Sequence, residues 1–332
     1  MITKIKEALT GEPTYRFKQT FSAVFERFID DWQKATNLPS NLKEKLQQTC
    51  PLEIPGKIFW SKNRTSVKAV ISLEDGLKIE TVLMRHQDGR NTVCLSSQAG
   101  CPLACKFCLT GQDGFNRNLT VEEIIVQVLF FARLLKKEEK RISNLVFMGM
   151  GEPFLNYQNV MEAIKIFNNQ EFFNIGARHI SISTVGVVGG IKKLSMEKLQ
   201  LNLAVSLHAS NNELRSQLIP ANEKYPLETI IKDLDYYLNK TRRRVMIEYL
   251  MIENLNDSPA QAQELSKLLK SLSSHLYFIN LIRYNQTDAF KSSGDMVVNN
   301  FKKVLEKNRI EVTERYRLGA DIGAACGQLA GK

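Results

Sequence analysis

Three closely spaced cysteines are the residues of this 332-residue chain whose types and spacing most clearly indicate chemistry. Cys101, Cys105 and Cys108 are spaced Cys-x3-Cys-x2-Cys within the string GCPLACKFCLTG. Three thiolates can hold three irons of a four-iron four-sulfur (4Fe-4S) cluster and leave the fourth iron open to a substrate. A structural zinc site usually has four protein ligands, often in Cys-x2-Cys pairs, so the spacing fits zinc less well. The pattern predicts a 4Fe-4S cluster, and a zinc knuckle or unrelated thiols are the alternatives.

A second group of candidate site residues is polar or glycine-rich and follows apolar runs. Gly151 and Glu152 occur in MGMGEP, where glycine lets a backbone approach a ligand and the carboxylate can accept hydrogen bonds from an ammonium group. The other members of the group are Ser183, the string Ser206, Leu207 and His208, and Asn285. Any one of them could be an ordinary turn or helix cap, but together they predict a ligand-binding rim.

Six apolar runs alternate with helical patterns from about Gly89 onward, which is typical of repeated βα units. The runs cover residues 92–95, 145–148, 179–183, 201–207, 245–251 and 277–282. Helical patterns begin near Thr120, where Glu123 completes a capping box, and near Pro226, Ser258 and Ser293. Six units predict an α/β fold, a partial (β/α)6 barrel with one side open to a large substrate. In such barrels the reactive groups lie at the carboxyl ends of the strands, where the cysteine loop and the polar rim both occur.

The first 90 residues follow different patterns. Aromatic and apolar residues recur at helical spacing from Phe17 to Phe28, and a second helical pattern covers residues 42–48. Two strand patterns, 66–71 and 77–84, flank the turn string Glu74-Asp75-Gly76 and predict a hairpin. The expected organisation is a helical domain over 1–55, a β-hairpin extension over 56–90, and a barrel core over 91–332.

Composition limits the class of protein. Six cysteines, of which three belong to one motif, do not form a disulfide framework and indicate a reducing compartment. No apolar stretch reaches the length of a membrane span and no signal-peptide pattern opens the chain, so a cytoplasmic protein is expected. The net charge of +10 favours a polyanionic partner, although a basic balance needs a second signal before it indicates nucleic acid.

Several strings provide that second signal. The string Cys-x3-Cys-x-Phe-Cys, completed by Phe107, resembles the signature of the radical S-adenosylmethionine (SAM) superfamily, in which the open iron binds SAM. The strings CLSSQ, GFNRNLT, MGMGEPFLN, AVSLHA and the terminal AACGQL closely resemble the RlmN/Cfr family of radical SAM RNA adenine methyltransferases. The resemblance covers nearly the whole chain, and it implies that the helical domain over 1–55 binds RNA and that the core over 91–332 ends in a catalytic-cysteine segment. It implies methylation of an adenine ring carbon in the peptidyl-transferase region of 23S rRNA, and in some members of an adenine beside the tRNA anticodon.

The resemblance also implies roles for three further residues. Cys326 would receive a methyl group from one SAM and then bond to the base, Cys94 would resolve the resulting protein-RNA adduct by forming a disulfide, and Glu80 would accept the ring proton. The polar rim would bind SAM. Cys94 in an apolar strand pattern could instead be a buried small residue, and Glu80 could be an ordinary exposed carboxylate on a strand.

The resemblance further implies an electron-donor partner, and it leaves open whether the C2 or the C8 carbon of adenine is methylated. An electron donor such as flavodoxin or ferredoxin would reduce the cluster, and the protein is expected to be a monomer. Gln286 stands where the family usually has Pro, Gly323 where Asp is common, and Arg283 is shared with the branch that methylates the C8 carbon. The other strings favour C2. Alternatives from other classes are a radical SAM enzyme of small molecules and an iron-sulfur RNA-binding protein without catalysis.

Overall fold

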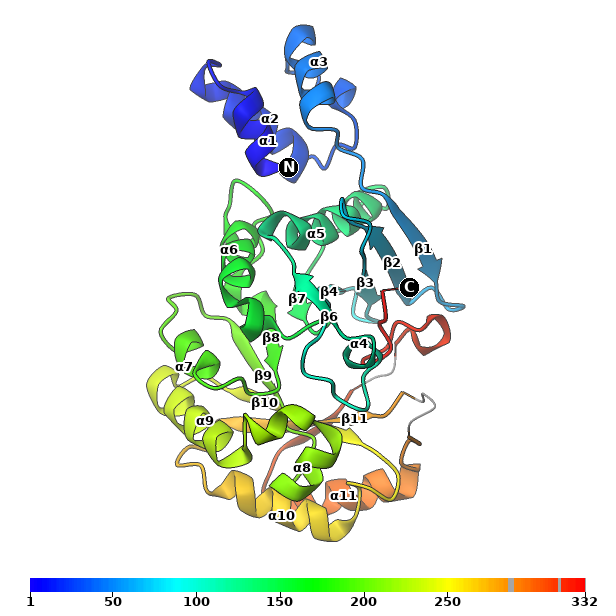
Figure 1. The fold of residues 1–332 in the computed structure, drawn as a ribbon, viewed down its shortest axis with the longest axis vertical. Helices are drawn as coiled ribbons and strands as arrows, with labels where there is room; N and C mark the ends of the chain where they lie inside the picture. Colours follow the sequence, from blue (N-terminus) through cyan, green and yellow to red (C-terminus); the bar gives the residue numbers. More distant parts are fainter. Residues whose placement is uncertain (286–289, 316–317, 332) are drawn as a thin grey trace.

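A mixed β-sheet forms the centre of the protein in the computed structural model, which describes residues 1–285, 290–315 and 318–331 (Figure 1). Its strand order within these residues is β1-β2-β3-β4-β7-β8-β9-β10-β11-β12. The strands are β1 (Gly56–Trp60), β2 (Ser66–Ser72), β3 (Lys78–Arg85), β4 (Asn91–Cys94), β7 (Asn144–Phe147), β8 (Ile180–Thr184), β9 (Asn202–Ser206), β10 (Val245–Met251), β11 (Tyr277–Arg283) and β12 (Val312–Glu314). A separate antiparallel pair consists of β5 (Gln98–Gly100) and β6 (Phe115–Asn118).

The six predicted strands form the parallel part of the sheet. Strands β4, β7, β8, β9, β10 and β11 pair in chain order, each parallel to the next, and β12 adds a further parallel strand. Strands β1 and β12 lie at opposite ends of the order, so the sheet is open within the described residues. The α/β fold with an open, partial barrel is therefore confirmed.

Helices connect the parallel strands. The helices of the described residues are α1 (Ile2–Ala8), α2 (Thr14–Phe25), α3 (Ser40–Thr49), α4 (Leu109–Gln112), α5 (Val121–Lys136), α6 (Tyr157–Asn168), α7 (Gly190–Leu194), α8 (Asn212–Leu218), α9 (Leu227–Thr241), α10 (Pro259–Lys270) and α11 (Asp295–Lys307). The capping box predicted at Thr120 and Glu123 is present at the start of α5, and Ser258 and Gln261 form another at α10. Helix α11 begins one residue later than expected, after Gly294.

The N-terminal helices α1, α2 and α3 lie together at one end of the molecule (Figure 1). Phe21 and Phe25 of α2 pack against Phe172 with ring centroids 5.4 and 5.1 Å apart, so the aromatic stripe is core rather than free surface. The predicted periodicity extended to Phe28, but the helix ends at Phe25 and Phe28 has a φ of 54°. The predicted hairpin is present as β2 and β3. The division at residues 55 and 90 stays a prediction, which limited proteolysis can test.

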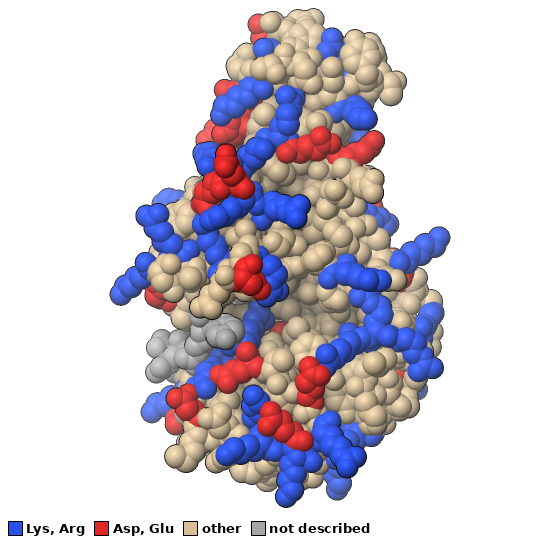
Figure 2. Space-filling model, turned by 180° about the vertical axis from the view of Figure 1, so that it is seen from behind, with Lys and Arg blue, Asp and Glu red and all other residues tan. Residues whose placement is uncertain are grey.

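The surface carries many cationic side chains. Lys and Arg are distributed over most of the face in Figure 2, with acidic residues between them. Among the described residues, no helix combines the length and apolar character that crossing a bilayer requires.

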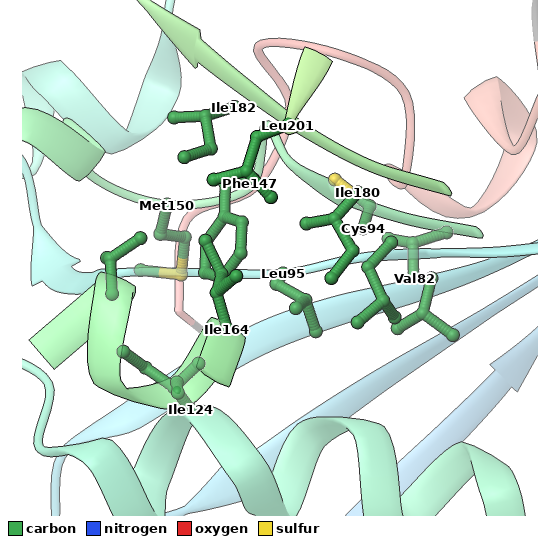
Figure 3. Close-up of a cluster of buried hydrophobic side chains, with 14 of the residues drawn as sticks. Val82, Cys94, Leu95, Ile124, Phe147, Met150, Ile164, Ile180, Ile182 and Leu201 are labelled. Atoms are coloured by element: carbon green, nitrogen blue, oxygen red, sulfur yellow. The ribbon is translucent and has the colours of Figure 1, made fainter. Parts of the chain in front are cut away.

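The core lies between the outer face of the sheet and the helices that cover it. Leu95, Phe147 and Ile182 pack toward Ile124 of α5 and Ile164 of α6, as Figure 3 shows. Met150, which follows β7, belongs to the same buried cluster. This apolar layer fixes the carboxyl ends of the strands, from which the candidate site is built.

Candidate functional site

The three motif cysteines lie on a tight loop between β5 and α4. The loop requires glycine at its start, because a Cβ on Gly100, whose φ is +79°, would lie 2.1 Å from the carbonyl oxygen of Gly114. The backbone N–H of Cys101 donates to the same oxygen at 2.8 Å. Cys105 accepts a hydrogen bond through its carbonyl from the N–H of Cys108 at 3.1 Å, which turns the chain back into α4. All three cysteines line one pocket.

The pocket fits a cluster better than a single metal ion. Within the described ranges, no three His, Cys, Asp or Glu side chains converge as the ligands of one ion would. In a 4Fe-4S cluster each thiolate binds a different iron, so the thiolates surround a volume rather than a point. Burial raises the pKa of Cys101 to about 12 and raises those of Cys105 and Cys108, so cluster binding must displace protons from these thiols.

Gly151 and Glu152 lie in the same pocket, after β7. Gly151 has a φ of +94°, and a Cβ there would lie 2.5 Å from Cβ of Gln98, so glycine is required. The carboxylate of Glu152 accepts hydrogen bonds from the backbone N–H groups of Phe154 at 3.0 Å and Val185 at 2.9 Å. Glu152 was expected to accept hydrogen bonds from an ammonium group; in the structure its carboxylate joins the loops that follow β7 and β8. Burial raises its pKa to about 7 despite these hydrogen bonds.

The hydroxyl groups of Ser183 and Ser206 converge on a residue that sequence reasoning missed. Both donate to Oε2 of Glu248, at 2.7 and 3.2 Å, and all three residues line the pocket. Glu248 is buried in β10, and its Oε1 accepts a hydrogen bond of 3.3 Å from Nη1 of Arg315. The only available signal was a single glutamate in the apolar run VMIEYLM. A buried carboxylate in such a run needs polar partners, and it finds them at the site.

His208 faces the cluster loop and has a defined tautomer. Its Nδ1 accepts a hydrogen bond from the N–H of Leu250 at 3.1 Å, so the neutral ring carries its proton on Nε2. Burial lowers the pKa of His208 to about 3, and the ring contacts Phe107 edge-on with centroids 5.0 Å apart. Leu207 contributes differently from what was expected: its side chain is fully buried, and its N–H donates to the carbonyl of Glu248 at 3.1 Å.

A second pocket brings Cys94 and Cys326 together. Both cysteines line it, and Cys326 and Arg315 also line the pocket of the motif cysteines. Asn285 was expected at the SAM rim, but it lines the second pocket, where its Nδ2 donates to the carbonyl of Cys326 at 3.1 Å. Gln286, the neighbouring departure from the family pattern, lies outside the described residues.

Cys94 lies between an apolar neighbour and a charged one. Cys94 is buried at the end of β4, and its sheet partner Val82 lies beside it in Figure 3. Burial raises the pKa of Cys94 to about 12, with a smaller contribution from the charge of Cys326, and the guanidinium of Arg315 opposes the shift. Arg315 is the second site residue that sequence reasoning missed, because no motif contains it.

Glu80 lies under the C-terminal segment, residues 319–331. It is 1 % exposed, so the alternative of an ordinary exposed carboxylate is wrong. Its Oε1 is 3.4 Å from Nζ of Lys68, and its Oε2 accepts a hydrogen bond of 3.3 Å from the N–H of Ala330. Lys68 also donates to the carbonyl of Gly323, whose φ of +61° suits glycine at this departure from the family pattern. Glu80 is not among the described residues that line either pocket.

Comparisons with known proteins agree with this geometry. Residues 95–265 match the family model described as "Radical SAM superfamily". The chain is 43% identical over 332 residues to "Probable dual-specificity RNA methyltransferase RlmN" of Dictyoglomus turgidum, which covers 99% of this chain and 94% of the relative. It is 41% identical to "Ribosomal RNA large subunit methyltransferase N" of Nitrosopumilus maritimus, which covers 96% of this chain and 93% of the relative.

A solved structure extends the likeness to three dimensions. The crystal structure of a radical SAM methyltransferase from Sphaerobacter thermophilus has a TM-score of 0.93 and 40% identity, and the match covers 99% of this chain and 97% of the other. With its cysteine loop, strand-end rim and terminal thiol in one site, the chain belongs to the radical SAM superfamily and, within it, to the RlmN family of RNA methyltransferases.

Proposed function

We propose that this protein methylates the C2 carbon of an adenine in the peptidyl-transferase region of 23S rRNA, and also an adenine beside the tRNA anticodon. The observation that carries the proposal is the position of Cys326, which lines both the pocket of the motif cysteines and the pocket of Cys94. A thiol so placed can exchange a group with SAM on one side and meet a second thiol on the other.

The polar residues of the first pocket would bind the cofactors. Cys101, Cys105 and Cys108 would hold the cluster, while Gly151, Glu152 and the hydroxyl groups of Ser183 and Ser206 would bind SAM. When bound, the cluster and SAM would supply the one-electron chemistry that removes a hydrogen atom from a methyl group on Cys326. His208, with its proton on Nε2, would offer a donor toward this pocket.

Cys326 would carry the carbon that is transferred. Its thiolate would attack the methyl carbon of one SAM and displace S-adenosylhomocysteine, and after hydrogen removal the methylene carbon would bond to the ring carbon of adenine. This route suits an electron-poor ring carbon, which cannot attack a sulfonium methyl group as an amine does. The protein and the RNA are then joined through Sγ of Cys326.

Release would depend on Cys94 and Glu80. The Cys94 thiolate attacks Sγ of Cys326, the sulfur–methylene bond breaks, and its electron pair leaves with the methylene carbon, which takes a proton to become the methyl group. To restore the aromatic ring, the radical adduct must also lose one electron, which the oxidised cluster would accept, and its ring proton, which would pass to the Glu80 carboxylate. The products would be a Cys94–Cys326 disulfide and methylated adenine. Because Ala330 covers Glu80, this step needs the end of the C-terminal segment to move aside.

Mass spectrometry of RNA from cells that carry the protein tests the proposal. A methyl group on adenine C2 is expected in 23S rRNA and in tRNA, and it should disappear when Cys326 is replaced by alanine. A methyl group on C8 would assign the product of the antibiotic-resistance branch instead. The same proposal includes an external one-electron donor, such as flavodoxin or ferredoxin, which reconstitution of the activity with each donor tests. It also includes a monomeric state, which sedimentation tests.

A further inference from the structure

We propose that Phe59 and Lys57, on the exposed edge strand β1, form a contact site for a single-stranded segment of the substrate RNA that flanks the target adenine. This inference rests on the proposed RNA substrate. It adds the place at which RNA outside the active site is held, which no motif of the chain identifies.

Strand β1 is the free edge of the sheet. It pairs with β2 on one side and with no other strand of the described residues, and all five of its residues are exposed. Ile58, Phe59 and Trp60 are 39%, 43% and 39% exposed. Edge strands are usually short, charged or covered, so three consecutive large apolar side chains on an exposed edge indicate a binding surface.

The register of the sheet places Phe59 in one row with the reactive thiol. Phe59 pairs with Lys68, Lys68 with Val82, and Val82 with Cys94. Directly paired residues point to the same face of a sheet, and neighbouring strands are about 4.8 Å apart, so Phe59 lies roughly 14 Å from Cys94 along that face. Lys57 is in the corresponding row with Glu80, through Val70.

The lysine and arginine side chains near β1 favour the binding of a polyanion. Nζ of Lys68 lies 5.5 Å from the centroid of the Phe59 ring, and the exposed Lys57 makes no ion pair with the described part of the chain. Lys62 and Arg64, which follow the strand, are likewise without an ion pair among these residues. Lys68 is ion-paired with Glu80, so Lys57, Lys62 and Arg64 are the cations that can meet phosphates. Together with an exposed aromatic ring on which a base can stack, they match single-stranded nucleic acid.

The reaction itself requires such a segment. An enzyme that works on a base must take the base out of its stack, and the nucleotides beside it then lose their own stacking partners. An aromatic side chain on a strand about 14 Å from the strand of Cys94 can accept one of these bases. The predicted interaction therefore holds the RNA on the side of the sheet where the chemistry occurs.

Trp60 provides a matched control. It belongs to the same strand and is almost as exposed as Phe59, but its side chain points to the opposite face. It also has cations over its ring, because the guanidinium groups of Arg64 and Arg85 lie 5.6 and 5.4 Å from the ring centroid. The two residues differ mainly in the face that they present.

The test measures the affinity of anaerobically reconstituted protein for a fluorescently labelled RNA hairpin that contains the target adenine. Phe59→Ala should weaken binding about 5- to 100-fold, because one stacked base is lost. Phe59→Trp should retain binding, and the affinity of Trp60→Ala should stay within about twofold of the parent affinity.

Lys57→Ala tests the contact with phosphate. It should reduce the slope of log K against log salt by about one unit. Circular dichroism and the S-methylation of Cys326 should be unchanged in every variant.

The outcomes separate this proposal from the proposed function. If the parent binds and methylates RNA while Phe59→Ala and Trp60→Ala behave alike, the contact site is wrong and the function stands. If the parent cleaves SAM but neither binds nor methylates RNA, both proposals fail. If Phe59→Ala alters only self-association in sedimentation, β1 is an interface between copies of the chain and the RNA site is overturned.

Discussion

The side-chain amide of Asn285 donates a hydrogen bond of 3.1 Å to the backbone carbonyl of Cys326, so the loop after β11 holds the segment that carries the terminal thiol. Oδ1 of Asn285 is buried and has no hydrogen-bond partner among the described residues. Within the described part of the chain, the amide is thus oriented by its donor side. The hydrogen bond helps to hold Cys326 where it lines both pockets.

Replacing Asn285 should disturb Cys326 more than the fold. Asn285→Ala and Asn285→Asp both remove the donor, and a lost hydrogen bond of this kind costs about 0.5–1.5 kcal/mol. We expect methylated RNA to form about 2- to 10-fold more slowly in single-turnover reactions, while the thermal unfolding midpoint changes little. A parent-like rate for Asn285→Asp would show that the amide donor does not position Cys326.

The two-cysteine mechanism predicts a trapped species. Cys94→Ala should still be methylated on Cys326 and should still bond to RNA, but no thiolate is then available to displace Sγ of Cys326. A protein-RNA adduct that survives denaturation and disappears with nuclease should accumulate, as seen by gel electrophoresis. Cys326→Ala should form none. Normal turnover by Cys94→Ala would leave Cys94 with a packing role only.

Adduct resolution should accelerate with pH. Burial raises the pKa of Cys94 to about 12, so at neutral pH the folded protein holds it as a thiol, and the thiolate fraction rises about tenfold with each pH unit below that value. We expect the release of methylated RNA to be faster at pH 9 than at pH 7, while S-methylation of Cys326 serves as the internal reference. A flat profile would mean that deprotonation of Cys94 does not limit release.

Glu248 should be needed for SAM binding. Glu248→Gln removes the charge that accepts hydrogen bonds from Ser183 and Ser206 and that pairs with Arg315. Hydrogen bonds to charged groups contribute about 1.5–3 kcal/mol, so SAM affinity should fall about 10- to 100-fold in equilibrium dialysis with reconstituted protein. Glu197→Gln, which lies outside both pockets, is the control and should bind like the parent. Equal affinities would exclude Glu248 from the SAM site.

The cysteine loop should bind about four irons per chain after anaerobic reconstitution, with the brown absorption of a 4Fe-4S cluster. Cys101→Ala should lose both the bound iron and the brown absorption. Because Cys101, Cys105 and Cys108 have raised pKa values and must be deprotonated to bind iron, reconstitution should be more complete at pH 8.5 than at pH 6.5. Stoichiometric zinc without iron in protein isolated without oxygen would contradict the assignment.

The six parallel strands from β4 to β11 were predictable because each is a largely buried run of mostly apolar residues. Strand β10 coincides with the predicted run 245–251, and the others agree within a residue or two. Strand β1 was missed because all five of its residues are exposed, so no alternation marks a buried face. The capping box at Thr120 was found because its two partners are three residues apart in sequence.

The misplaced site residues have a different cause. Glu80 has the alternation of an exposed strand residue, but a segment 250 residues later lies over it. Glu248 and Arg315 are joined across 67 residues and belong to no motif. Asn285 was expected at the SAM rim but lines the second pocket, and its partner there, Cys326, depends on the path of the C-terminal segment. Periodicity reports local burial and cannot supply such long-range pairings.

The C-terminal segment joins parts of the chain that are synthesised far apart in time. Its contacts with Thr110, Glu80 and Lys62 span 219, 250 and 259 residues. Contacts of such separation close late, because the intervening chain must first be made and ordered. On the ribosome, the cysteine loop and most of the sheet emerge before Cys326 exists. If Cys326 carries the transferred carbon as proposed, catalysis can begin only after residues 319–331 have been made and have packed against the rest of the fold.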